Sequence, residues 1–469
     1  MNNSILKSDL NATEFYVQSQ DRIRRYLKGD FFESVSIALA TSAETAQSYS
    51  GQVLTLVAAN LLSRFCRHVI LSLPDILLHP HLAQPPNQWL IERVQSEMYG
   101  ANPYGHFEES KIIPKQVDYI LQLGKSDNGR LSANLVADGD GWVAYIARND
   151  QSPFEKHVSL NPVGPAAAAC MAIADIFKVF TGVPEHLRID RLVLSFFDFS
   201  LNESCLLAPA IPAVIDIGRT QMIGVGSVGS SVLYMLSLLP VKGHLDLIDH
   251  QCVELVNLDR APIFAASDVG RPKVSVGERW IRGSGLQVRP HQAKFSEFIG
   301  THSRFEQSPD LVLLLANEHN VYADLQSNFP PLIIYGTTTA SWGVNLGRHI
   351  PLKEECVLCR YPNQVEPIYK CATTDFMSLQ QAEQTERVDA SLPFLSFMAG
   401  VLATAELLKA QFQGYPFHGG FAYLDLIGVL GRIDLLHREK RSECLCNQQS
   451  RRIYKQCLKG SRWAKLSLD

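Results

Sequence analysis

The sequence lacks several features that would place a protein in a membrane-bound, secreted or nucleic-acid-binding class. No apolar run reaches the roughly 18 residues that a membrane span needs, and the start, MNNSILKSDLNATEF, has no apolar core of a signal peptide. There is no long basic stretch, and the net charge is -4 at pH 7, which argues against general binding to nucleic-acid phosphates. We therefore expect a cytoplasmic protein that binds neither membranes nor nucleic acid.

The size and composition predict an ordinary globular protein of more than one domain. The chain has 469 residues, of which 46% are hydrophobic and 19% are charged. A chain of this length exceeds what a single hydrophobic core usually supports, so two or three domains are expected.

Cysteine is unevenly distributed. Ten cysteines are present, and two tight pairs, CVLC at 356–359 and CLC at 444–446, hold four of them. A disulfide framework is not expected in a cytosolic protein, so these pairs indicate a metal site or reactive thiols. The spacing of Cys356 and Cys359 is that of a zinc knuckle, and Cys444 and Cys446 would complete a four-thiolate site.

A glycine-rich turn between two predicted strands indicates a nucleotide site. The strand TQMIGV leads into Gly224, Gly226 and Gly229, a helix follows, and a second strand, HLDLID, ends at Asp249. Glycines allow a phosphate to approach the start of the helix closely, and an acid at the end of the second strand can accept hydrogen bonds from a ribose. Such a unit could also belong to a dehydrogenase.

The residues after Asp249 favour a triphosphate over a dinucleotide. Asn257, Arg260 and Lys273 would add one amide and two cations just past the edge of the sheet. These groups could orient a triphosphate and stabilise charge on a leaving pyrophosphate. A dehydrogenase is the least favoured alternative, because no residue for hydride transfer is evident.

The first half of the chain looks like a diverged copy of the second. Its run of strand, helix and strand over about residues 35–74 has the same order but no glycine-rich turn, and the helix at 164–182 parallels the one at 393–414. Without glycines, this copy cannot bring its backbone close to a phosphate. We expect a structural partner domain.

The combined motifs GVGSVG, LIDHQCVELVNLDR and DVGRPKV resemble the adenylating domain of ubiquitin-activating enzymes and their ThiF/MoeB relatives. The resemblance runs from about residue 218 to 450. It implies that the three glycines line the phosphates of ATP, that Asp249 contacts the ribose, and that Asn257, Arg260 and Lys273 contact the triphosphate.

The sequence departs from the family pattern at the magnesium position. The family has an aspartate after the next strand, where LLLANEHN places Asn317. An amide is a poorer ligand than a carboxylate for Mg²⁺. The family also commonly has glutamine after the arginine, where this chain has Ala261.

The resemblance assigns further roles outside the nucleotide turn. The four paired cysteines would hold the family's structural zinc, and Cys371, in YKCATTDFMS, resembles the cysteine that forms a thioester in the crossover segment. In relatives with one inactive copy, that copy lends an arginine to the ATP. Arg22, in QDRIRRYLKGD, is at the matching position.

We therefore predict an α/β protein with two Rossmann-like adenylation domains. Residues 1–205 would form the degenerate domain and residues 206–469 the active one, with a crossover segment at 360–392. The expected activity is adenylation of a ubiquitin-like protein by ATP with Mg²⁺, then a thioester on Cys371 and transfer to a separate conjugating enzyme. The layout resembles activating enzymes of bacterial ubiquitin-like (Bil-type) operons linked to phage defence.

Two other functions fit the same residues. One is adenylation of a sulfur-carrier protein without a thioester, although such enzymes usually pair two identical chains. The other is a nucleotide-binding scaffold without turnover, which the asparagine at the magnesium position would favour. The sequence leaves a homodimer open.

Overall fold

The computed structural model describes most of the chain in two α/β units. The described residues are 10–20, 23, 33–83, 86–126, 133–148, 150–201, 208–301, 309–316, 319–328, 330–339, 341–351, 353–360, 392–412, 420–427, 433–436, 439–444, 446–447, 452, 454–455 and 462–463. Arg22, Asn317, Cys371 and nearly all of the predicted crossover segment lie outside them.

The first unit is built on a seven-stranded sheet of order β3-β2-β1-β4-β5-β6-β7. The five strands from β3 to β5 run parallel, whereas β6 is antiparallel to both of its neighbours. Its elements are α1 (Ala12–Ser19), β1 (Ser36–Thr41), α3 (Ala43–Gln47), α4 (Tyr49–Ser63), β2 (His68–Ser72), α5 (Leu90–Ala101), β3 (His106–Glu109), β4 (Tyr119–Leu123), β5 (Leu135–Asp140), β6 (Val143–Ala147), α6 (Val163–Phe180), η2 (Glu185–Leu187) and β7 (Arg191–Ser195).

The second unit is built on an eight-stranded sheet of order β10-β9-β8-β11-β12-β13-β14-β15. Its elements are β8 (Ile215–Ile223), α7 (Ser227–Ser237), β9 (Val241–Ile248), η4 (Leu255–Asn257), η5 (Ala266–Asp268), α8 (Lys273–Ile281), β10 (Leu286–His291), α9 (Phe295–Thr301), β11 (Leu311–Leu314), α10 (His319–Ser327), β12 (Ile333–Thr338), β13 (Gly343–His349), α11 (Val357–Arg360), α12 (Pro393–Lys409), β14 (Phe421–Asp425) and β15 (Ile433–Leu436). After α12, strands β14 and β15 form an antiparallel pair.

The two sheets share one topology, as the proposed duplication requires. Strands β1 to β7 correspond in order to β8 to β14, because each sheet places its first strand at the centre and its third strand at one edge. The directions also agree, since both sheets change from parallel to antiparallel between the fifth and sixth strands. Only β15 has no counterpart in the first sheet.

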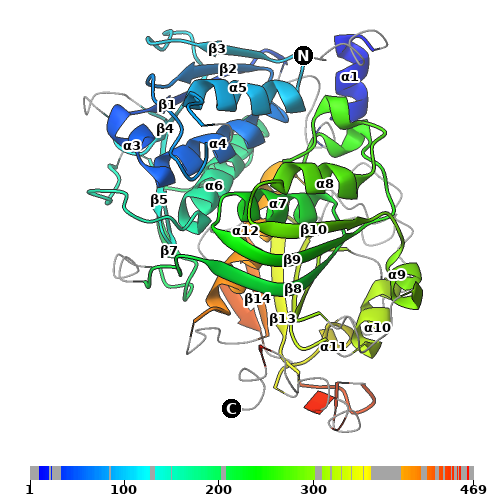
Figure 1. Ribbon diagram of the computed structural model, residues 1–469. Helices are drawn as coiled ribbons and strands as arrows, with labels where there is room; N and C mark the ends of the chain where they lie inside the picture. Colours follow the sequence, from blue (N-terminus) through cyan, green and yellow to red (C-terminus); the bar gives the residue numbers. More distant parts are fainter. Residues whose placement is uncertain are drawn as a thin grey trace.

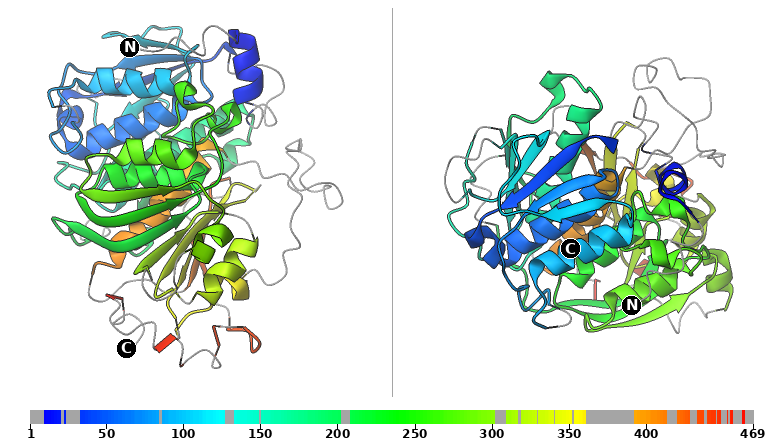
Figure 2. Two further views of the ribbon diagram at one scale, coloured as in Figure 1. Left: turned by 45° about the vertical axis from the view of Figure 1, so that its right-hand side comes forward. Right: turned by 90° about the horizontal axis from the view of Figure 1, so that it is seen from above.

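Helices α4, α6, α7 and α12 lie between the two sheets and join the units (Figures 1 and 2). Helix α6 packs on β5 and β6 of its own sheet and on α12, which in turn packs on α7 and β12. Helix α6 is long and apolar enough to cross a membrane by length and composition, but 89% of it is buried inside the protein. It is therefore the buried helix that the sequence predicts.

Each copy of the central helix carries the same buried ion pair. Arg148, just after β6, binds Asp175 of α6 at 2.7 Å, and Arg348 of β13 binds Glu406 of α12 at 3.3 Å. Both acids are fully buried. A buried carboxylate needs a charged partner, so the repeated acid in the two helices is explained by the repeated arginine.

In each helix, the lysine three residues after the acid has its pKa raised by the charge of a carboxylate in the other unit. Burial lowers the pKa of Lys178 to about 8, and Asp175 and Asp425 oppose this shift. Burial also lowers the pKa of Lys409, and the opposing charges include Asp198 of the first unit. The two units therefore each place a carboxylate near the buried lysine of the other, in an approximately symmetric arrangement.

We expect Gly400→Ala to weaken the contact between α12 and α7. A Cβ atom there would lie 2.5 Å from the Cβ of Ser231 and 2.9 Å from its carbonyl carbon. Such overpacking should lower the free energy of unfolding, measured with denaturant, by about 1–3 kcal/mol. The control is Gly300→Ala in α9, where a Cβ meets no atom within 4 Å. Equal effects of the two substitutions would contradict this account.

Candidate functional site

The three glycines of the predicted nucleotide turn have three different roles. Gly224 ends β8 with φ of 93°, which favours glycine, and an added Cβ would lie 2.9 Å from the backbone nitrogen of Ala316. At Gly229 a Cβ would lie 2.1 Å from the carbonyl oxygen of Gly224, so this glycine lets α7 approach the strand. A Cβ at Gly226 meets nothing within 4 Å. Gly226 is the N-cap of α7, and the open space beside it is where a phosphate could approach.

Asp249 follows β9 and forms a hydrogen bond with the backbone of the glycine turn. One carboxylate oxygen accepts a hydrogen bond from the backbone N–H of Val225 at 2.8 Å, and the other accepts from the backbone N–H of Gln251 at 2.8 Å. The carboxylate therefore lies directly beside the turn, as a ribose-binding acid should. Each oxygen retains a lone pair for a further donor.

Lys273 lies close to Asp249, because both residues bind Gln251. It is the first residue of α8, is 6% exposed, and its Nζ donates to Oε1 of Gln251 at 2.6 Å. Burial lowers its pKa, Asp249 opposes that shift, and the charge of Arg260 adds to it. Asp249 and Lys273 are linked through Gln251, whose backbone N–H donates to the carboxylate and whose side-chain oxygen accepts from the amine. Gln251 was missed from the sequence, although its position directly after the acid could have indicated it.

Asn257 and Arg260 lie on the segment between β9 and α8. The side-chain oxygen of Asn257 accepts from the backbone N–H of Glu254 at 2.9 Å and caps η4. Arg260 is 7% exposed, and its guanidinium donates to the carbonyl oxygen of Val256 and to Asp259. The structure thus holds both side chains in defined positions on one short segment. Their contact with a triphosphate stays a prediction.

Helix α1 of the first unit lies against this segment. It contacts η4, and it is anchored on its own unit by the hydrogen bond from the hydroxyl of Tyr16 to Asn102 at 3.0 Å. Ile23, three residues past the helix end at Gln20, is buried. Arg22 itself lies outside the described residues, so its contact with ATP stays a prediction.

Two other predicted residues are also outside the described part of the chain. Ala316, which precedes Asn317, lies against Gly224, so the chain reaches the nucleotide turn immediately before the predicted magnesium position. Cys371 lies in the segment 361–391, none of which is described. The roles of both residues remain predictions.

The two cysteine pairs converge although more than 80 residues separate them in sequence. The sulfur of Cys356 is 3.3 Å from that of Cys444, and the sulfur of Cys359 is 3.4 Å from that of Cys446. All four sulfur atoms lie within 4.8 Å of one another. A tetrahedral ion with metal–sulfur bonds of about 2.3 Å needs sulfur atoms about 3.8 Å apart, so this donor set fits one metal ion. The cluster involves α11, far from α8 in Figure 1.

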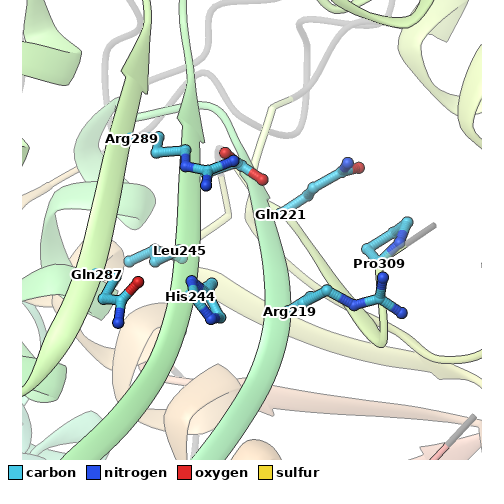
Figure 3. A pocket seen from close by; sticks show the side chains of 8 residues that line it. Arg219, Gln221, His244, Leu245, Gln287, Arg289 and Pro309 are labelled. Atoms are coloured by element: carbon cyan, nitrogen blue, oxygen red, sulfur yellow. The ribbon is translucent and has the colours of Figure 1, made fainter. Parts of the chain in front are cut away.

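A separate hollow lies on the exposed part of the second sheet (Figure 3). It is lined by Arg219 and Gln221 of β8, by residues of β9, and by Gln287 and Arg289 of β10. Its lining acid, Asp246, lies 2.9 Å from His291, and its lining base, Arg219, lies 3.7 Å from Asp310. This hollow shares no lining residue with the glycine turn.

The glycine geometry predicts separable effects of two substitutions. Gly226→Ala should cost about 1 kcal/mol or less of stability, because the methyl group enters open space, but it should weaken ATP binding at least about tenfold. Gly229→Ala should instead lower the free energy of unfolding by about 1–3 kcal/mol. Calorimetric ATP titration and denaturant unfolding of both variants test this. Indistinguishable effects on the two measurements would show that the glycines have no separate roles.

The cysteine cluster predicts about one bound metal ion per chain. Cys356→Ser should remove the ion from the purified protein, as measured by elemental analysis, and a chelator should lower the unfolding temperature of the unsubstituted protein by several degrees. Cys252→Ser, a change outside the cluster, serves as the control and should retain the ion. A metal content that is unchanged in Cys356→Ser would rule out this site.

Comparison with known families divides the chain as the two sheets do. Residues 214–446 match the ThiF family, and residues 36–193 match the BilD N-terminal domain. The first match spans β8 to β15 and the converging cysteines, and the second runs from the start of β1 into β7.

Three curated relatives each match more than 200 residues of the chain. An uncharacterized protein y4jF of Sinorhizobium fredii is 26% identical over 58% of this chain and 50% of its own length. The SAMP-activating enzyme E1 of Haloferax volcanii is 25% identical over 42% of this chain and 76% of its own. The molybdopterin-synthase adenylyltransferase of Escherichia coli is 24% identical over 56% of this chain and 97% of its own. The chain spans about half the length of the first of these relatives.

Solved structures also match. A crystal structure of Escherichia coli MccB with MccA-N7isoASN aligns with a TM-score of 0.37 and 17% identity, over 49% of this chain and 67% of that one. The family assignment itself rests on the two matched domains and on the sequence relatives. The chain belongs to the ThiF family, and a BilD-type N-terminal domain precedes its ThiF domain.

Proposed function

We propose that the protein adenylates the C-terminal carboxylate of a small protein. The observation that carries this proposal is the pair of Asp249 and Lys273, linked through Gln251 beside an open glycine turn, with Arg260 on the neighbouring segment. A carboxylate oxygen of the substrate attacks the α-phosphorus of ATP, the bond from that phosphorus to the bridging oxygen breaks, and pyrophosphate leaves. The two cations stabilise the negative charge that builds up on the leaving group.

The substrate that we propose is a ubiquitin-like protein. The name of the Haloferax relative, an E1 that activates SAMP, supports a small-protein substrate, and so does the match to the BilD N-terminal domain. The sulfur-carrier alternative is favoured by the Escherichia coli relative, a molybdopterin-synthase adenylyltransferase that the alignment covers almost completely. Both alternatives share the adenylation step.

For the ubiquitin-like substrate, the second step that we propose is a thioester on Cys371. The thiolate attacks the carbonyl carbon of the acyl-adenylate, the bond to the phosphate oxygen breaks, and AMP leaves. The acyl group then passes to a separate conjugating enzyme in the cytoplasm. The support for this step is the sequence YKCATTDF and its place between the first cysteine pair and α12.

The first unit has a proposed role in the same reaction. It presents α1 to η4 of the ThiF domain, and Arg22 follows that helix, so an arginine from the first unit could contact the phosphates. We further propose Mg²⁺ as the ion that accompanies ATP at Asn317, and zinc as the ion of the four-cysteine cluster.

The two steps are tested by ATP–pyrophosphate exchange and by a non-reducing gel. With Mg²⁺ and a ubiquitin-like protein, the full chain should catalyse exchange and form an adduct that a thiol reductant removes. Cys371→Ala should lose the adduct but keep the exchange rate within about threefold, because the first step does not use the thiol. Cys252→Ser is the matched control, and it should retain both.

The alternative outcomes identify different functions. Exchange without an adduct in the unsubstituted protein would exclude the thioester and favour activation of a sulfur carrier. Absence of exchange with every small protein tested would refute adenylation and leave a nucleotide-binding scaffold.

A further inference from the structure

A buried arginine of the first unit reaches into the ThiF domain. Arg64 caps the end of α4 and is 3% exposed. Its guanidinium donates from Nη1 to the carbonyl oxygen of Leu258 at 2.5 Å and from Nη2 to that of Pro262 at 2.8 Å. The third donor, Nε, binds Oδ1 of Asn60 at 2.9 Å and sets the orientation of the guanidinium. Both carbonyl groups therefore have their spacing set by one rigid, planar group.

These two carbonyl groups flank Arg260. Leu258 and Pro262 lie two residues before and two residues after it, so Arg64 holds both ends of the backbone segment that presents this arginine. The side chain of Arg260 is then directed by contacts within its own segment, to Val256 and Asp259. Arg64 therefore influences the side chain of Arg260 through the backbone segment whose carbonyl groups it binds.

The same network also reaches the helix that begins at the glycine turn. The amide nitrogen of Asn60 donates to Pro262 at 3.1 Å and to Oε2 of Glu97 at 2.9 Å. That carboxylate oxygen accepts a further hydrogen bond from the hydroxyl of Tyr234 in α7 at 2.8 Å. The first unit thus ties α7 and the Arg260 segment to one set of buried side chains.

The charge of Arg64 is retained at neutral pH despite its burial. Burial lowers the pKa of Arg64 to about 10, and the nearby charges of Glu97 and Asp259 oppose the shift. The guanidinium therefore donates all its hydrogen bonds under ordinary conditions. An unpaired carbonyl group left by its removal would be costly in this buried place.

We propose that Arg64 of the BilD-type domain is a positioning residue for the ATP site, because it holds the Leu258–Pro262 segment in the register that directs Arg260 to the triphosphate. This inference rests on the proposed adenylation. It gives the first unit a second role, distinct from any donated arginine near its N-terminus. Arg64 positions the site through the backbone and contacts no phosphate.

The test compares Arg64→Lys with Tyr49→Phe by ATP–pyrophosphate exchange in the full chain. Lysine keeps the charge but cannot bind both carbonyl groups in a planar fork, so kcat/KM for ATP should fall roughly ten- to hundredfold. The KM for the small-protein substrate should stay within about twofold. Tyr49 is the first residue of α4, at the opposite end of the helix from Arg64. Its hydroxyl also donates across the interface, to the carbonyl oxygen of Leu238 at 2.7 Å. Tyr49→Phe should keep the exchange kinetics within about twofold while losing a similar interdomain hydrogen bond.

A milder variant protects the test against misfolding. Asn60→Ser removes the acceptor that orients Arg64 and one donor to Pro262, so it should lower kcat/KM for ATP in the same direction but less. If Arg64→Lys does not fold, Asn60→Ser is compared with Tyr49→Phe in its place. Exchange kinetics that match those of Tyr49→Phe would overturn the inference.

The outcomes also separate this inference from the proposed function. A chain without substitutions that binds no ATP and catalyses no exchange would refute the adenylation and this role together. Normal exchange in the unsubstituted chain and an unaffected Arg64→Lys would refute only the role of Arg64. An equal rise in the KM for ATP and in the KM for the small protein would indicate general damage at the interface. That result would also overturn the role of Arg64.

Discussion

Helices α6 and α12 pack against each other between the two sheets, and the placement of both units follows from that contact. Both helices are buried along almost their whole length, and Gly400 lets α12 also approach α7 closely. Each helix still contains a buried acid, which pairs with an arginine of its own unit. Apolar packing supplies most of the stability of this contact and of the relative orientation of the two units.

That orientation lets a unit without a nucleotide turn contribute to the nucleotide site of its neighbour. The first strand of the degenerate unit runs into Ser42, whose hydroxyl caps α3, so backbone N–H groups that could bind a phosphate are used within the protein. The same unit presents α1 and Arg64 to the segment around Arg260. The first unit, which lacks the glycine turn, thus contacts the ThiF domain through buried side chains and a helix.

Much of the fold was accessible from the sequence because its signals are local. The strands β1, β2, β8 and β9, the glycine turn, and the paired helices α6 and α12 were all predicted and are confirmed. The segment around 80–160 was not, because its strands are short and its turns rich in glycine, proline and asparagine, so pairing with distant strands decides their order. Of the candidate site, Gly224, Gly226, Gly229, Asp249 and Lys273 could be placed, since they follow strands whose carboxyl ends meet at one edge.

The sequence by itself determined the class of site: a glycine turn, an acid after the next strand, and two pairs of cysteines with metal-binding spacing. Those properties depend on residue type and local spacing, which a sequence states directly. Only the tertiary structure decided which distant groups meet. Arg64 looks in sequence like an ordinary residue at a helix end, yet it binds two carbonyl groups almost two hundred residues away. The reason is physical, since the packing of α6 on α12 sets the position of α4 relative to the ThiF domain, and no local pattern encodes that contact.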